Sequence, residues 1–144
     1  MTYATSTLGA DHTCDNAVPS PTNPDYNPGA PTEQGPVSQF LKIYNAAVDS
    51  LSICHFAYLP ALDMPELQKQ WVSCVSALRG ETLDENYLMQ LGTSVMRVER
   101  EFNDAVGFTN QDDRVTRYFV EEKLPPTGNT FKFPEEELDN VNKF

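Results

Sequence analysis

The residues best suited to chemistry lie in two short stretches, "LGADHTC" (8–14) and "DSLSICHF" (49–56). In the first, the carboxylate of Asp11 precedes the imidazole of His12, and such a pair can orient the ring for proton transfer. The stretch has no helical periodicity, so a solvated loop histidine is the simpler interpretation. On residue chemistry alone, that interpretation is favoured over catalysis.

The second stretch combines a carboxylate and a thiol near the end of an apolar-patterned segment. Asp49 borders the apolar face, where its carboxylate either faces water or accepts paired N–H bonds from a flat heterocycle. Free cysteines usually behave as small buried hydrophobes. Residue chemistry therefore favours a core role for Cys54 over a ligand role, and it leaves both interpretations of Asp49 open.

The remaining cysteines give no recognisable metal site. Cys74 lies on the apolar face of an expected helix and is predicted to be a core residue, whereas Cys14 has polar neighbours and is expected at the surface. The three thiols come from separate segments and lack the paired spacing of a zinc site. Their odd number and their spacing favour a reducing cytoplasm over a disulfide scaffold.

Charge and hydropathy exclude several classes of function. The chain has 144 residues, and its 10 Lys and Arg against 21 Asp and Glu give a net charge of -11. Such a charge repels nucleic acid and anionic lipid, so neither is expected as a partner. No run reaches the roughly 18 apolar residues that a membrane span needs. The N-terminus also lacks a secretory signal pattern, and we expect a cytoplasmic protein of one domain.

The elements that must position these residues are expected to be helices. Residues 1–36 hold most of the eleven prolines, which predicts an irregular segment carrying the His12 motif. From there to residue 144 we expect a helical domain, entered at Pro36. Its first apolar face repeats at three- and four-residue steps, at Val37, Phe40, Leu41, Tyr44, Val48 and Leu51.

Two further helices follow in the pattern. Asp63 can cap a second helix that ends at Gly80, with one face formed by Leu67, Trp71, Cys74, Val75 and Leu78. The run from Thr82 to Glu85 matches a capping box, and it predicts a third helix that Gly107 ends. The apolar face of this third helix is expected to comprise Leu88, Leu91, Val95, Val98 and Phe102.

Only short helical pieces are expected after Gly107. A short amphipathic piece is predicted around Val115, Tyr118 and Phe119, and a last helix begins at Pro134 with three glutamates in its first turn. No segment of useful length has the two-residue period of a strand. The fold class is therefore predicted to be all-α, a small helical domain.

Three stretches together resemble the tungsten-containing aldehyde:ferredoxin oxidoreductase family. "YATSTLGADH" (3–12) resembles its A-T-S-x-R-G-A-x-H element, and "DSLSICHF" resembles its D-S/T-L-x-x-C-x-F element. The segment from Leu91 to Pro126 is similar to its C-terminal signature. The matching residues there are Phe102, Asn103, Gly107, Phe108, Asp112, Asp113, Arg117, Phe119, Leu124 and Pro125. The three stretches follow the order of the family at similar spacing.

The resemblance implies a helical C-terminal domain of an enzyme that oxidises aldehydes to carboxylic acids. In that family a tungsten bis-pterin performs the oxidation and a nearby 4Fe–4S cluster relays electrons to ferredoxin. By the match, Cys54 would be a cluster ligand and His12 would lie close to tungsten as a proton donor. Asp49 would hydrogen-bond one pterin, and Ile53 and His55 would help to line it.

Several departures accompany the resemblance. The family's other three cluster cysteines come from an upstream C-x-x-C-x-x-x-C that this sequence does not contain, and the family's N-terminal domain supplies most pterin contacts. Leu8 replaces a usual arginine, and Cys14 stands where a basic residue is common. The Arg-Glu pair of the family signature is Ala105-Val106 here.

Two hypotheses follow from the resemblance and its departures. In the first, the chain is the C-terminal part of a tungstopterin oxidoreductase, works with the missing N-terminal domains, and is inactive alone. In the second, it is an isolated helical domain without catalysis, either a fragment or a protein-interaction module. The first predicts an uncovered apolar face where the other domains and the cofactor belong, whereas the second predicts that this face is buried.

Overall fold

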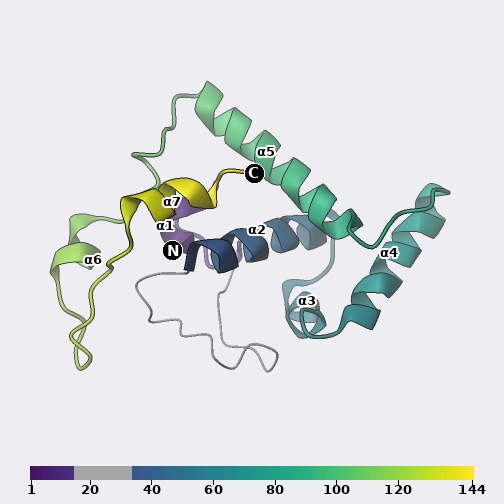
Figure 1. Ribbon diagram of the computed structural model, residues 1–144, viewed down its shortest axis with the longest axis horizontal. Coiled ribbons are helices and arrows are strands. Elements are labelled where there is room, and N and C mark those ends of the chain that lie inside the picture. Colours follow the sequence, from purple (N-terminus) through teal and green to yellow (C-terminus); the bar gives the residue numbers. More distant parts are fainter. Residues whose placement is uncertain (15–33) are drawn as a thin grey trace.

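A computed structural model describes residues 1–14 and 34–144, and all regular elements in that part of the chain are helices (Figure 1). An isolated antiparallel bridge pairs Leu124 with Asn129. The predicted all-α class is therefore confirmed. The helices are α1 (Thr2–Thr5), α2 (Gln34–Ser50), α3 (His55–Ala61), α4 (Pro65–Arg79), α5 (Tyr87–Ala105), α6 (Arg117–Glu121) and α7 (Glu135–Val141).

Helices α2 and α5 form the centre of the molecule. They cross at Gly92, where an added Cβ atom would lie 1.8 Å from the carbonyl oxygen of Ile43. No side chain fits in that space, so glycine permits the two backbones to approach each other. Helix α7 packs on both α1 and α2. Helix α3 packs on α2 near its C-terminal end (Figure 1).

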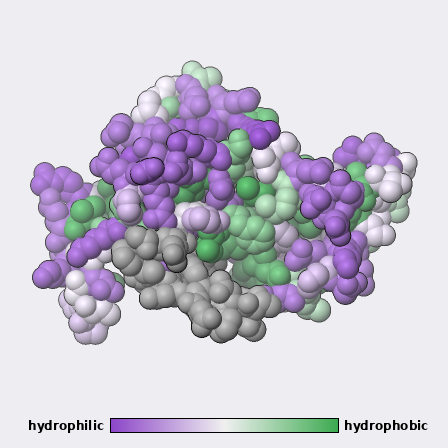
Figure 2. Space-filling view, in the orientation of Figure 1, coloured by the Kyte–Doolittle hydropathy of each residue, from purple (hydrophilic) through white to green (hydrophobic). Residues whose placement is uncertain are grey.

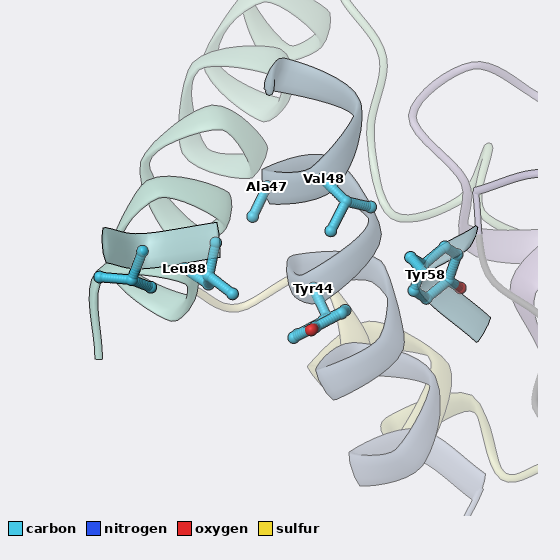
Figure 3. Packing of buried hydrophobic residues seen from close by; sticks show 6 residues of the cluster. Tyr44, Ala47, Val48, Tyr58 and Leu88 are labelled. Atoms are coloured by element: carbon cyan, nitrogen blue, oxygen red, sulfur yellow. The ribbon is translucent and has the colours of Figure 1, made fainter. Parts of the chain in front are cut away.

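A small hydrophobic cluster lies between α2 and its neighbours (Figure 3). Three of its residues come from consecutive turns of α2, and one each comes from α3, α4 and α5: Tyr44, Ala47, Val48, Tyr58, Val72 and Leu88. Burial raises the pKa of Tyr44 to about 12, because a phenolate would be poorly solvated among these apolar side chains. Of the apolar face predicted for the first helix, Leu41, Tyr44 and Val48 are buried, whereas Phe40 is 47% exposed.

A chain of polar contacts, here called the polar clasp, fastens both ends of the chain to α2. Its members are Thr5, Lys42, Arg100, Asp113 and Asn142. The buried ammonium of Lys42 donates to the carbonyl of Thr5 at 2.6 Å, and the side-chain amide of Asn142 donates to the same carbonyl at 2.9 Å. Arg100 donates to Asp113 at 2.7 Å. The loop that follows Thr5 therefore starts from a fixed point.

Helix boundaries agree with the sequence at some ends and differ at others. Gly80 ends α4 in the left-handed conformation, with φ +68°, as predicted. The N-cap of α4 is Met64 rather than Asp63. The capping box at Thr82 is also wrong, because α5 begins at Tyr87. Asp84 instead accepts the backbone N–H of Asn86 at 2.7 Å, and this turn delays the helix.

The apolar face predicted for α4 is only partly buried. Leu67, Trp71 and Val75 are half-buried, whereas Cys74 and Leu78 are exposed, Leu78 to 88%. The prediction that Cys74 belongs to the core is therefore wrong. The buried residue of α4 is Val72, which the predicted face did not include. Helix α4 lies at the edge of the molecule and packs on α3 through one side, so no described element covers the rest of its face (Figure 1).

One side of the C-terminal half of α5 is also uncovered. Val98 and Phe102 continue the predicted apolar face, and both are more than half exposed. The short helix α6 buries none of its residues. Within the described residues, no helix has both the length and the hydropathy to cross a membrane.

Candidate functional site

Two loops adjoin α2. One is the turn of residues 51–54, which joins α2 to α3, and the other is the loop of residues 6–14, which follows α1. In the turn, Ser52 adopts a positive φ of 57° and the N–H of Ile53 donates to the carbonyl of Val48 at 2.9 Å. This sharp reversal places Cys54 at the N-cap of α3, with its side chain exposed.

The loop after α1 is tied to α5. The hydroxyl of Thr7 donates to the carboxylate of Glu99 at 2.6 Å, and the amide of Asn103 donates to the carbonyl of Thr7 at 3.1 Å. Sequence reasoning missed both contacts, although Asn103 belongs to the quoted C-terminal signature. They explain physically why these two distant stretches belong to one site.

A small pocket of about 80 Å³ lies where the loop, α2 and α5 meet. Its lining includes the three carboxylates of Asp11, Asp49 and Glu99, together with Asn45 and Lys42 of α2. Pockets that enclose an organic cofactor usually measure about 300–1,000 Å³. This pocket is therefore too small to enclose an organic cofactor by itself.

Asn45 links the loop of residues 6–14 to His55, the first residue of α3. It lies one helical turn before Asp49, and only 2% of its surface is exposed. Its Nδ2 atom donates to the carbonyl of Thr13, and its Oδ1 atom lies 3.2 Å from Nδ1 of His55. The sequence carried a signal that could have identified it, because a polar residue between Tyr44 and Val48 interrupts the buried face of α2.

Asp49 is exposed, and it lines the same pocket as Asn45. The surrounding protein desolvates it and raises its pKa, an effect that the nearby His55 opposes. Negative charges on Asp11 and Glu99 raise the pKa of Asp49 further. No hydrogen bond within the described part reaches this carboxylate, so it is available to a ligand donor.

The residues around Cys54 differ in what they can offer. Ile53 is half buried and packs against the core cluster, so its backbone rather than its side chain faces outward. The ring of His55 makes an edge contact with Tyr58, with 4.8 Å between the ring centroids. The expected core role of Cys54 is wrong, because its side chain is exposed.

His12 lies in a loop, as the sequence predicted, and 72% of its side chain is exposed. Its Nδ1 atom is 4.0 Å from the carboxylate of Asp11, too far for a hydrogen bond. The backbone N–H and the hydroxyl of Thr13 donate to Asp11 instead, and they lower the pKa of that carboxyl. Asp11 therefore fixes the loop more than it orients His12.

The donor set fits a site to which this part of the chain contributes one metal ligand. The described residues contain no group of three or more His, Cys, Asp or Glu side chains that could hold a metal ion. Cys54 is exposed at a rigid turn, and a thiolate in that position can complete a cluster whose other ligands come from elsewhere. An exposed carboxylate with free acceptor oxygens likewise suits a flat heterocycle.

Comparison with known proteins gives one match. A sequence model of a family described as "Aldehyde ferredoxin oxidoreductase, domains 2 & 3" matches residues 1–142 of the chain. The match includes both loops of the site and the helices that position them. Comparisons with curated proteins and with solved structures give no significant match.

Proposed function

The chain belongs to the aldehyde ferredoxin oxidoreductase family, and from that premise we propose that it forms one wall of a tungstopterin active site. The resemblance drawn from three short motifs is confirmed at the level of the family. The proposed reaction converts an aldehyde and water into a carboxylic acid, two protons and two electrons, and ferredoxin accepts the electrons. When bound, the tungsten bis-pterin and the 4Fe–4S cluster supply the redox chemistry.

The residues of this chain have distinct proposed roles. Cys54 is the one cluster ligand that the chain contributes, and its thiolate projects from the turn before α3. Asp49 accepts hydrogen bonds from one pterin through its exposed carboxylate. Ile53 and His55 flank the thiolate and line that pterin. His12, whose side chain is exposed on the loop of residues 6–14, exchanges a proton with the substrate oxygen.

The observation that carries this proposal is the uncovered apolar surface around the site. Phe56, two residues after Cys54, is 82% exposed, and Leu8, in the pocket-lining loop, is 75% exposed. Figure 2 shows hydrophobic surface over the region of α2 and α3, whereas the surface over α7 is mostly hydrophilic. Large apolar side chains beside a catalytic wall are expected where another domain covers it.

We propose that the first domain of the family is that covering domain. The matched model is described as domains 2 and 3, and the small pocket and the single cysteine ligand both call for a second wall. The alternative is an isolated helical domain that works alone as an interaction module. It is disfavoured because such a domain would bury its apolar face or pair it with another copy.

Co-expression tests the proposal. The chain is produced alone and together with a first domain of the same family, and each preparation is analysed for bound iron, bound tungsten and aldehyde-dependent reduction of a dye. We expect metals and activity only in the joint preparation. Aldehyde oxidation by the chain alone, or a stable joint complex without iron and tungsten, would overturn the proposal.

A further inference from the structure

The side chain of Asn45 on α2 contacts both the loop of residues 6–14 and His55, the first residue of α3. Its neighbours in the pattern of α2, Tyr44 and Val48, are apolar core residues. A buried amide at such a position needs hydrogen-bond partners, because an unsatisfied one costs about 1–3 kcal/mol. Asn45 finds them in the backbone of the loop and in the imidazole of His55.

The chemistry of these partners fixes the orientation of the amide. The carbonyl oxygen of Thr13 can only accept, so the amide must present its NH₂ group to Thr13. Its Oδ1 atom then faces His55 at 3.2 Å, and this oxygen can also only accept. The proton of the neutral His55 ring must therefore lie on Nδ1, which leaves Nε2 as the acceptor nitrogen.

We propose that Asn45 is a positioning residue that fixes His55 in the Nδ1–H tautomer and fastens the His12 loop to α2. The edge contact with Tyr58 sets the plane of the ring, and the bond to Asn45 sets its rotation and its tautomer. One buried amide thereby determines which nitrogen His55 presents and where the loop of residues 11–14 lies.

Only the role of the His55 tautomer in the active site rests on the proposed function. In a tungstopterin site, an Nε2 acceptor beside Cys54 would receive a hydrogen bond from a pterin N–H group, whereas an Nε2–H would repel it. The geometry of Asn45 itself does not depend on any cofactor. It can be measured in the metal-free chain.

Nitrogen NMR of the two histidines in the chain provides the first test. The ¹⁵N-labelled full chain is studied at mildly alkaline pH, where free imidazole is neutral, and His12→Ala assigns the two rings. We expect the His55 ring to show Nδ1–H shifts, with His12 showing the mixture of a solvated ring. In Asn45→Ala, His55 should change to the mixed pattern that His12 shows.

Asn45→Asp separates the two contacts. A carboxylate still accepts from Nδ1 of His55, but it cannot donate to the carbonyl of Thr13. We expect this variant to keep a proton on Nδ1 and to release the loop. Release is measured at Cys14, which is half buried and makes a contact to the carbonyl of Asp11 at 3.6 Å. Its rate of alkylation should rise several-fold relative to that of the exposed Cys74.

Each result decides the proposal. His55 with its proton on Nε2 in the parent chain, or unchanged ring shifts in a folded Asn45→Ala, would overturn it. If Asn45→Ala does not fold, Asn45→Asp decides, and an unchanged Cys14 rate in that variant would count against the loop contact. Failure of the joint preparation to bind metal would instead reject the proposed function and leave these NMR results standing.

Discussion

Helix α5 borders two different surroundings. Its N-terminal half packs against α2 at Gly92 and joins the core cluster, and one side of its C-terminal half joins the polar clasp through Arg100. The other side of its C-terminal half presents Val98 and Phe102 to solvent, as the edge helix α4 presents Leu78. The same apolar periodicity runs through both halves, so the sequence pattern alone does not distinguish them.

The difference separates a packed region, which the described residues stabilise, from an open region with exposed apolar residues. The packed region fixes the two site loops by buried contacts, and its stability should depend strongly on single side chains. The open region has largely exposed apolar residues, and substitutions there should matter mainly when a partner binds. The predictions below test this contrast in matched pairs.

The largest effect on stability is expected for Gly92→Ala. The added methyl group would overlap the carbonyl of Ile43, so α2 and α5 must separate, at a cost of about 3 kcal/mol in unfolding free energy. The matched substitution in the open region is Gly80→Ala, which only strains a left-handed C-cap and should cost about 1 kcal/mol. Urea denaturation followed by circular dichroism measures both. Equal losses would contradict the contrast.

The second pair compares two arginines. Arg100→Met leaves the largely buried carboxylate of Asp113 without its main donor, and we expect a loss of about 2 kcal/mol. Arg117→Met removes an exposed pair with Glu121 and should change stability by less than about 0.5 kcal/mol. The same denaturation experiment measures these losses. A larger effect at Arg117 would show that α6 is not part of the open region.

The third pair tests association. Phe56→Ser removes an exposed ring beside Cys54, and it should weaken binding of the first domain about tenfold, or 1.4 kcal/mol. Leu78→Ser changes an equally exposed residue on α4, away from the site, and should leave binding unchanged. Titration calorimetry measures both affinities, and neither variant should lose stability alone. Equal weakening by the two variants would place the interface elsewhere.

The smallest effect concerns pH. Burial raises the pKa of Asp49, so its contribution to stability is present below its ordinary pKa and is lost as pH rises through the raised value. Hydrogen bonds from Thr109 lower the pKa of Asp112. The contribution of Asp112 to stability is therefore present above its ordinary pKa and is lost on acidification. Asp49→Asn should therefore gain stability relative to the parent at neutral pH, and Asp112→Asn should lose it. Denaturation midpoints at acidic and neutral pH check the two signs.

Periodicity predicted the helices well because it records which side chains are apolar. It predicted most of α2, the glycine end of α4 and the start of α7 after Pro134. The entry at Pro36 was wrong, because α2 begins at Gln34, and the segment predicted to be irregular contains the short helix α1; residues 15–33 of that segment lie outside the described part of the chain. It failed for Cys74 and Leu78, because periodicity does not reveal whether a neighbouring element covers the face. It also missed the delayed start of α5, where Asp84 forms a local turn that competes with the helix.

The motifs identified candidate residues, but they did not reveal the contacts around them. The assignments of His12, Asp49 and Cys54 stay predictions, and of these three Asp49 lines the pocket beside α2. The contacts that hold the loop of residues 6–14 join residues far apart in sequence, such as Thr7 with Glu99 and Thr13 with Asn45. No local pattern encodes such pairs, because they depend on how α2 and α5 cross.

Cys54 tests the central claim most directly, since it is the only metal ligand proposed for this chain. The joint preparation with the first domain is made with Cys54→Ala and, as a matched control, with Cys74→Ala, another exposed cysteine. Iron content and the electron paramagnetic resonance signal of the reduced cluster are then measured. The account predicts that Cys54→Ala loses the 4Fe–4S signal and that Cys74→Ala keeps it. An unchanged cluster in the Cys54→Ala complex would contradict the account.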